Sequence, residues 1–360
     1  MASIDDIARM KTAALTVMAT RGQDQDLVAQ LALRYAPAEI SADQNLRIIP
    51  CFGWHPWFSH QIIDDVSMEI RDDTIISKEE HYKNVLTPPV KDENLLHGLP
   101  EPFPLSKLMS ETRGRLEQHP HALVGEIGLD RSFRIPNAWF PHEIENRDTG
   151  LTPGSREGRT LSPHRVTLTH QKAILRAQLK LAGEMQRPVS VHSVQAHGAF
   201  FDLLQELWSG HEKKGVSNRQ RKRRPSVDKA HELSDHEQTE DKKGLLGRIS
   251  HPFPPRICMH SYSGPPDALK QFLRKSNPAD IYFSFSKIIN FTNDSSTKVI
   301  EVIKALPDDR ILVESDLHCA GERMDDLLEA IVRQICTIRE WDLEHGVRVL
   351  GENWKHFVFG

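Results

Sequence analysis

The sequence is short of hydrophobic residues and contains no long apolar run. Hydrophobic residues make up 38% of its 360 positions, which predicts polar insertions within an ordinary core. No apolar stretch approaches the roughly 20 residues that a membrane-spanning helix needs. The start of the chain carries Asp5 and Asp6 and lacks the basic and then apolar order of a signal peptide. We therefore expect no membrane partner, and a protein of the cytoplasm, the nucleus or both.

Cysteines are also few, and neither positive nor negative charge is in large excess. The four cysteines form no Cys-x-x-Cys pair, which favours buried free thiols over disulfides. The net charge is −4, from 46 basic and 50 acidic residues. Nothing in this balance attracts nucleic acid globally, so binding of that kind would have to come from a local patch.

Four apolar runs of strand length, in contrast, each lead to a residue type that binds metals. The residues at their ends are Glu126, His192, His260 and Asp316. Runs of this kind that alternate with helices indicate parallel strands, whose carboxyl ends carry the chemistry of α/β barrels. Imidazole and carboxylate ligands suit zinc, manganese, iron or magnesium. The pattern therefore predicts a hydrolytic metal centre.

The number of strands is one short of a closed barrel. A (β/α)8 barrel needs eight strands, and this chain opens with a helix-like segment and offers seven strand segments, at residues 14–19, 46–52, 122–127, 188–192, 256–260, 281–285 and 310–315. We expect one domain over residues 1–360 with the TIM-type fold, lacking its first strand. The segments 14–19 and 310–315 would then be unpaired edges.

Two polar insertions interrupt the pattern. Residues 131–163 are rich in glycine and proline and predict a long surface insertion. Residues 210–252 are highly charged and hold too few apolar groups to fold alone, which predicts disorder. The basic run at 221–224 has three interpretations: a solvated loop, a nuclear-import signal or a nucleic-acid contact.

His55 follows a further strand segment, in the sequence Gly53-Trp54-His55-Pro56. Its position allows contact with a substrate phosphate, in which case it is a substrate-binding residue. The alternative is that Trp54 and Trp57 simply pack a loop around it. The residues alone leave both interpretations open.

Together these segments resemble the TatD-type metal-dependent deoxyribonucleases of the amidohydrolase superfamily. The resemblance is close to a fungal branch described as interacting with a subunit of the anaphase-promoting complex. It covers nearly the whole chain outside the insertions. The motifs that carry it are Val124-Gly125-Glu126-Ile127-Gly128-Leu129-Asp130, Gly53-Trp54-His55-Pro56, His260-Ser261-Tyr262-Ser263-Gly264, Glu314-Ser315-Asp316, and the asparagine-phenylalanine element from Asn353 to Phe357.

The resemblance implies a role for each predicted site residue. Glu126 would bridge two divalent metals (Mg, Mn or Zn), His192 and His260 would bind them, and Asp316 would be both a ligand and the general base. Glu126 and Asp316 are thus the catalytic residues of this interpretation. The implied activity is hydrolysis of DNA phosphodiesters, with DNA as the partner molecule.

The chain departs from the family pattern at the metal site. The family opens with a strand that carries a His-x-His pair, and this sequence has no such pair near its start. Val194 stands where the family usually has an arginine, and Leu317 and His318 stand where a small residue and a proline are common. We therefore expect one metal rather than two, and weak activity. The alternatives are a catalytically weak barrel that acts as a protein-interaction partner in cell-cycle regulation, and an amidohydrolase of small molecules.

Overall fold

The structure is a computed structural model of the 360-residue chain. It describes residues 4–35, 47–67, 76–139, 143, 145, 158–213, 251–291 and 296–360.

A seven-stranded sheet forms the centre of the molecule, and all its neighbouring strands run parallel. In sheet order the strands are β1 (Ala14–Met18), β2 (Arg47–Phe52), β6 (Leu123–Asp130), β8 (Val189–Val194), β9 (Arg256–Met259), β10 (Asp280–Phe285) and β11 (Ile311–Val313). The sheet curls like a TIM-type barrel that lacks one strand, which confirms the predicted fold class. In the part of the chain that the structure describes, β1 and β11 are the edge strands, as predicted.

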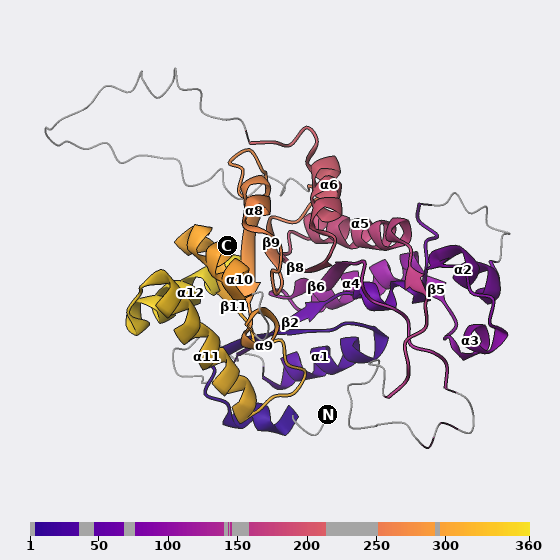
Figure 1. Ribbon diagram of the computed structural model, residues 1–360, viewed down its shortest axis with the longest axis horizontal. Helices are drawn as coiled ribbons and strands as arrows, with labels where there is room; N and C mark the ends of the chain where they lie inside the picture. The colour runs from indigo at the N-terminus through magenta and orange to yellow at the C-terminus, as the bar shows by residue number, and fades with distance from the viewer. Residues whose placement is uncertain are drawn as a thin grey trace, which may run out of the picture.

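Helices cover the outer face of the sheet, as Figure 1 shows. They are α1 (Gly22–Arg34), α4 (Leu105–Gln118), α5 (Leu168–Glu184), α6 (His197–Trp208), α8 (Pro266–Phe272), α9 (Lys287–Asn290), α10 (Ser296–Ala305), α11 (Glu322–Arg339) and α12 (Leu343–Phe359), together with the 3-10 segments η1 (Ile4–Arg9) and η4 (Asp308–Arg310). The sequence indicates only a short helix at the C-terminal end, whereas α12 has 17 residues. Gly346 and Gly351 weaken the helix signal of this segment, but burial of Leu350, Phe357 and Val358 supports the helix through packing.

Side chains of the strands alternate between two apolar layers, as the period of two in a β-strand requires. The outer layer, against the helices, takes residues such as Val191, Ile257 and Phe283. The inner layer lies inside the curl of the sheet and takes the intervening residues such as Cys258 and Tyr282. Helix α12 contacts both layers, because Leu350 belongs to the outer layer, whereas Trp354, Phe357 and Val358 complete the inner layer.

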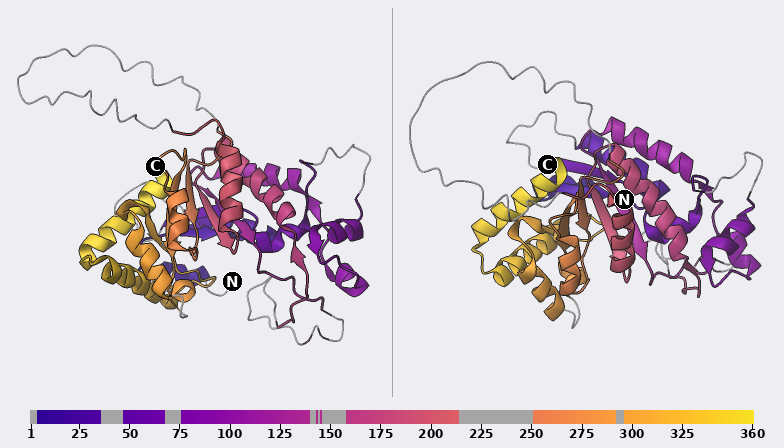
Figure 2. Two further views of the ribbon diagram at one scale, coloured as in Figure 1. Left: turned by 45° about the horizontal axis from the view of Figure 1, so that its top comes forward. Right: turned by 90° about the horizontal axis from the view of Figure 1, so that it is seen from above.

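A small satellite unit lies at the end of the molecule opposite α11 and α12, as all three views show (Figures 1 and 2). It contains η2 (Pro56–Gln61), α2 (Lys78–Val85), α3 (Glu93–Gly98) and the short strands β3 (Ile62–Ile63), β4 (Leu86–Thr87), β5 (Phe103–Pro104) and β7 (Arg165–Val166). The described ends of the 131–163 insertion bind each other here, since the backbone amide of Ser162 donates to the carbonyl of Ile135. Ile135 is buried in the apolar cluster of this unit.

Of the insertion at 210–252, residues 214–250 lie outside the described residues, and so does the basic run at 221–224. The predicted disorder of this insertion therefore stays a prediction. No helix in the described part of the chain is long and apolar enough to cross a membrane. Cys51, Cys258 and Cys336 are buried free thiols and Cys319 is an exposed one, so the preference for thiols over disulfides is confirmed.

Candidate metal centre

The alternation along the strands decides which ligand residues point into the curl of the sheet. Cys258 belongs to the inner layer, so His260, two residues later, falls on the same face. Leu312 belongs to the inner layer as well and places Glu314 on that face by the same rule. Because parallel strands end at one edge of the sheet, these side chains meet at its carboxyl edge.

Glu126 reaches the same face through an irregularity in β6. Val124 and Ile127 both lie in the outer layer, although residues three apart in a regular strand point to opposite faces. The pairing of β6 with β8 shifts register between these two residues, which restores the alternation and turns Glu126 inward. The Gly-Glu-x-Gly part of the motif thus encodes a β-bulge that presents the carboxylate.

The second glycine of this motif, Gly128, is needed because β8 passes close to β6 at this point. Gly128 has φ +153°, and a Cβ atom there would lie 1.9 Å from the carbonyl oxygen of His192. Only glycine allows the two strands to pair at this point. The same contact positions His192 directly beside the inner face of β6.

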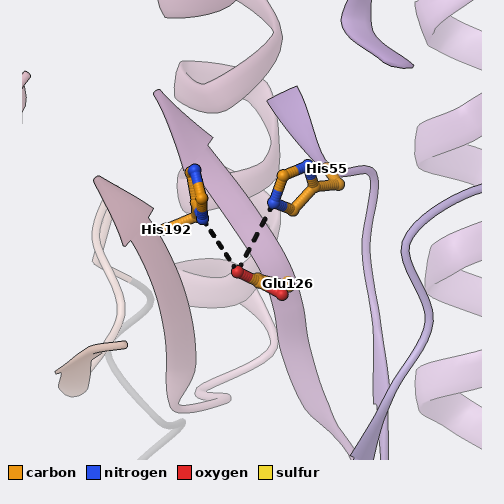
Figure 3. Close-up of side chains that lie close together, drawn as sticks. All are labelled: His55, Glu126 and His192. Carbon is orange, nitrogen blue, oxygen red and sulfur yellow. Dashed lines mark hydrogen bonds and ion pairs between the residues drawn. The ribbon is translucent and has the colours of Figure 1, made fainter. Parts of the chain in front are cut away.

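One carboxylate oxygen is the hub of the site. Oε1 of Glu126 lies 3.1 Å from Nδ1 of His192, 3.4 Å from Nε2 of His55 and 3.8 Å from Nε2 of His260. Figure 3 shows Glu126, from β6, between the ring of His192, from β8, and the ring of His55, which follows β2. The structure therefore brings together three of the four predicted metal ligands and adds the predicted substrate residue His55.

Asp316, the fourth predicted ligand, lies at the exposed side of this group. Its Oδ1 is 3.1 Å from Nε2 of His260, and its φ of +54° places it in the left-handed region, where non-glycine residues are uncommon. The loop after β11 thus turns the Asp316 carboxylate back toward His260. His55, in contrast, is only 3% exposed, so its predicted contact with substrate phosphate stays a prediction.

Two further acids orient the histidines, and the sequence analysis did not assign them to the site. Oδ2 of Asp130 lies 3.0 Å from Nε2 of His192, and Oε2 of Glu314 lies 2.8 Å from Nδ1 of His260. The sequence does contain a signal for both acids. Asp130 follows Glu126 by four residues and Glu314 precedes Asp316 by two, and residues an even number apart in a strand share a face. Carboxylates in this position fix the orientation of metal-binding imidazoles.

The electrostatics of the cluster favour ionised carboxylates. Burial alone would raise the pKa of Glu126, but the surrounding imidazoles, that of His260 foremost, hold it well below its ordinary value. Burial likewise opposes the charge on His192, yet hydrogen bonds to Asp130 and Glu126 raise its pKa to about 9. The pKa of His260 is raised well above its ordinary value, since attraction to Glu314 and Glu126 outweighs burial. The carboxylates are thus ionised, and the raised pKa values of the two imidazoles reflect the attraction of these carboxylates for positive charge.

The donor atoms present fit a divalent metal. His55, Glu126 and His192 each offer one ligand atom, and these atoms all lie within 4.8 Å of one another. Two imidazole nitrogens and a carboxylate oxygen form a donor set typical of zinc and manganese hydrolases. A metal bound to such a set lowers the pKa of water and stabilises the charge that develops on a phosphate oxygen.

A cavity of about 370 Å³ lies elsewhere, at the amino ends of the strands. Its lining includes Arg256 and Asp280, the first residues of β9 and β10. The predicted ligands all follow the carboxyl ends, where the active sites of barrels of this type lie. The ligand cluster rather than this cavity is therefore the candidate site.

Comparison with known families agrees with this geometry. The model of TatD-related DNases matches the sequence from residue 5 to residue 358. The chain belongs to the TatD-related DNase family. The predicted resemblance is thereby confirmed, and this membership supports a metal-dependent hydrolase or nuclease.

Two curated relatives of this TatD-family chain are fungal proteins. The Cut9-interacting protein scn1 of Schizosaccharomyces pombe is 34% identical over 98% of this chain and 93% of its own length. The uncharacterized deoxyribonuclease YMR262W of Saccharomyces cerevisiae is 28% identical over 85% of this chain and 80% of its own length.

Solved structures show the same fold. The TatD homolog YJJV of Escherichia coli has a TM-score of 0.52 at 17% identity, covering 99% of this chain and 90% of its own. A TatD-family hydrolase from Entamoeba histolytica has a TM-score of 0.53 at 11% identity, covering 99% of this chain and 88% of its own.

Proposed function

We propose that this chain is a metal-dependent hydrolase that cleaves DNA phosphodiesters at the Glu126 centre. The observation that carries the proposal is the convergence of three imidazole nitrogens on one carboxylate oxygen of Glu126 at the carboxyl edge of the sheet. Family membership supplies the substrate class, because the matching model describes DNases. The basic residues of the chain are balanced by acidic ones, so DNA would be bound locally rather than by the whole surface.

Each site residue has a role in this proposal. Glu126 and His192 hold the metal, and His55 and His260, whose Nε2 atoms face the same Glu126 oxygen, complete the donor set. Asp130 and Glu314 keep the rings of His192 and His260 in orientation through contacts of 3.0 and 2.8 Å. Asp316 lies at the solvent side of His260 and accepts the proton of the attacking water as general base. This is the catalytic role that the sequence analysis predicted for it.

We further propose that the site holds fewer than two metals. The 360-residue sequence contains no His-x-His pair near its start, and in the family pattern that pair completes the second metal position. Elemental analysis of the purified chain, saturated with Mn and desalted, is expected to give about one metal per molecule. Two tightly bound metals would contradict the proposal, and a chain stripped with chelator supplies the baseline.

The activity is tested on a single-stranded oligonucleotide with Mg or Mn. We expect slow, metal-dependent cleavage that His192→Ala reduces at least about a hundredfold, because the metal loses a ligand and Asp130 its partner. His318→Ala is the matched control, since this histidine is exposed in the loop after β11. Equal turnover by the wild-type chain and His192→Ala would show that another site performs the cleavage.

A second function is favoured by the relative at 34% identity, whose name describes a Cut9-interacting protein. In this alternative the chain is a catalytically weak barrel that binds a cell-cycle protein. Binding to the Cut9 counterpart of the same organism would be measured with the wild-type chain and with His192→Ala. Tight binding by both proteins, together with no metal-dependent cleavage, would favour the interaction function over the nuclease.

A further inference from the structure

An aromatic pair stands beside the Glu126 centre. Trp57 in η2 and Phe133 in the loop after β6 stack with ring centroids 4.8 Å apart and an interplanar angle of 11°. Trp57 is 37% exposed, and Phe133 is half-buried. The neighbouring Trp54 is only 4% exposed, and its indole donates to the carbonyl of Phe58 inside the fold. Loop packing therefore accounts for Trp54, whereas the Trp57–Phe133 pair remains open to solvent.

The pair is connected directly to the metal ligands. Nε1 of Trp57 donates a 2.7 Å hydrogen bond to Oδ2 of Asp130, the oxygen that also contacts Nε2 of His192. The Trp57 ring lies 4.8 Å from the ring of His55 and 5.9 Å from that of His192, in edge-to-face arrangements. A group stacked on the pair would thus lie next to the imidazoles of His55 and His192.

The surrounding charges suit a nucleic-acid strand. Arg131, which is exposed, and Arg134 lie close to Phe133 in the chain. The carboxylate of Asp130 accepts hydrogen bonds from the backbone amides of Ser132 and Phe133, so its charge is bound within the protein. Aromatic faces beside cationic side chains are the recurring means of holding single-stranded nucleic acid.

We propose that Trp57 and Phe133 form a stacking subsite for an unpaired nucleobase next to the scissile phosphodiester, with Arg131 and Arg134 contacting the flanking phosphates. This subsite rests on the proposed nuclease function and assigns the holding of the base to these two side chains. A base inside a duplex has both faces covered and cannot stack in this way.

The test compares two oligonucleotides of equal charge, a fluorescently labelled ten-nucleotide poly-dT and its abasic analogue. Binding is measured by anisotropy in chelator, so that neither metal loading nor cleavage enters. We expect the wild-type chain to bind poly-dT about tenfold more tightly than the abasic strand. Phe133→Leu keeps the apolar volume and the backbone bond to Asp130 but loses one of the two aromatic rings, and should reduce this preference.

Trp57→Phe is the matched variant that separates stacking from positioning. It retains an aromatic face but loses the indole N–H that holds Asp130, so the preference for poly-dT over the abasic strand should persist. Circular dichroism melting of each variant controls for folding.

Equal binding of both strands by the wild-type chain, binding of neither, or an unchanged preference in Phe133→Leu would each overturn the subsite. A retained base preference in a chain that cleaves no DNA with any metal would instead leave the subsite standing and contradict the nuclease function.

Discussion

At the scale of single residues, the site depends on backbone geometry as much as on ligand chemistry. Glu126 points inward because of a register shift in β6, and His192 lies beside it because Gly128 lets β8 approach. A ligand with the right chemistry on an unbroken strand would point to the helices instead. The glycines of this motif therefore position the metal ligands, although they bind no metal themselves.

We predict that Gly128→Ala lowers the free energy of unfolding by about 2–4 kcal/mol, because the new Cβ would meet the carbonyl of His192 at a strained φ. Metal affinity should fall as well, since His192 must move. Urea denaturation measures the first effect and calorimetric titration with Mn the second.

Gly114→Ala is the control for this prediction. A Cβ at Gly114, in α4, meets nothing within 4 Å, and the change should raise stability by about 0.5–1 kcal/mol through helix propensity. A Gly128→Ala protein as stable as the wild-type chain would show that β6 and β8 can separate without cost.

At the scale of elements, α12 connects the two unpaired edges of the sheet. Asn353 donates to the carbonyls of Asp308 and Ile311, at the start of β11. Trp354, the next residue, donates from its indole to Oγ1 of Thr16 in β1. A helix thus bridges the seam that an eighth strand would fill, which limits the exposure of both edges.

We predict that Asn353→Ala lowers the free energy of unfolding by about 1–3 kcal/mol, because the buried bond to the Ile311 carbonyl and the part-buried bond to the Asp308 carbonyl are both lost. The exposed Lys355 of the same helix offers a control, Lys355→Ala, that should change stability by less than about 0.5 kcal/mol. Urea midpoints of the two variants check this, and equal midpoints would argue against α12 as the bridge.

At the scale of the whole molecule, acid stability is set partly by buried histidines away from the metal centre. His60 and His81 lie in the satellite unit, and His170 lies in the first turn of α5 beside it. Nε2 of His81 faces the carbonyl of His60, and Nε2 of His170 faces the carbonyl of Ser59. Burial lowers the pKa of His60 to about 3 and also lowers the pKa of His81 and His170. These rings are therefore neutral in the folded protein, whereas an exposed histidine gains a proton near pH 6.5.

The sign of the pH effect follows from proton uptake. Between pH 6.5 and about 3 the unfolded chain binds a proton at His60 that the folded chain does not, so stability is lost as the pH falls. Each such histidine contributes at most about 1.4 kcal/mol per pH unit.

We predict that His60→Gln flattens the pH dependence of the urea midpoint between pH 6 and 4. His318→Gln, at an exposed position, should leave the slope unchanged, and equal slopes for both variants would contradict the prediction.

Much of this protein follows from local sequence alone. The apolar runs of strand length, the helix-like segments between them and the count of seven strand segments predict the parallel fold and its missing strand, because these signals lie within single segments. The residue types at the strand ends likewise predict a metal centre. Family motifs add roles for Glu126, His192, His260 and Asp316, which still await a test.

Only the tertiary structure decided what those residues touch. Asp130 and Glu314 hold the histidine rings, and His55 joins Glu126, through contacts between segments that are distant in the chain. The length of α12 and its bridge across the seam also depend on burial against strands far away in sequence. Sequence patterns report which face of an element is apolar, but the pairing and curl of the sheet determine which side chains meet at its edge.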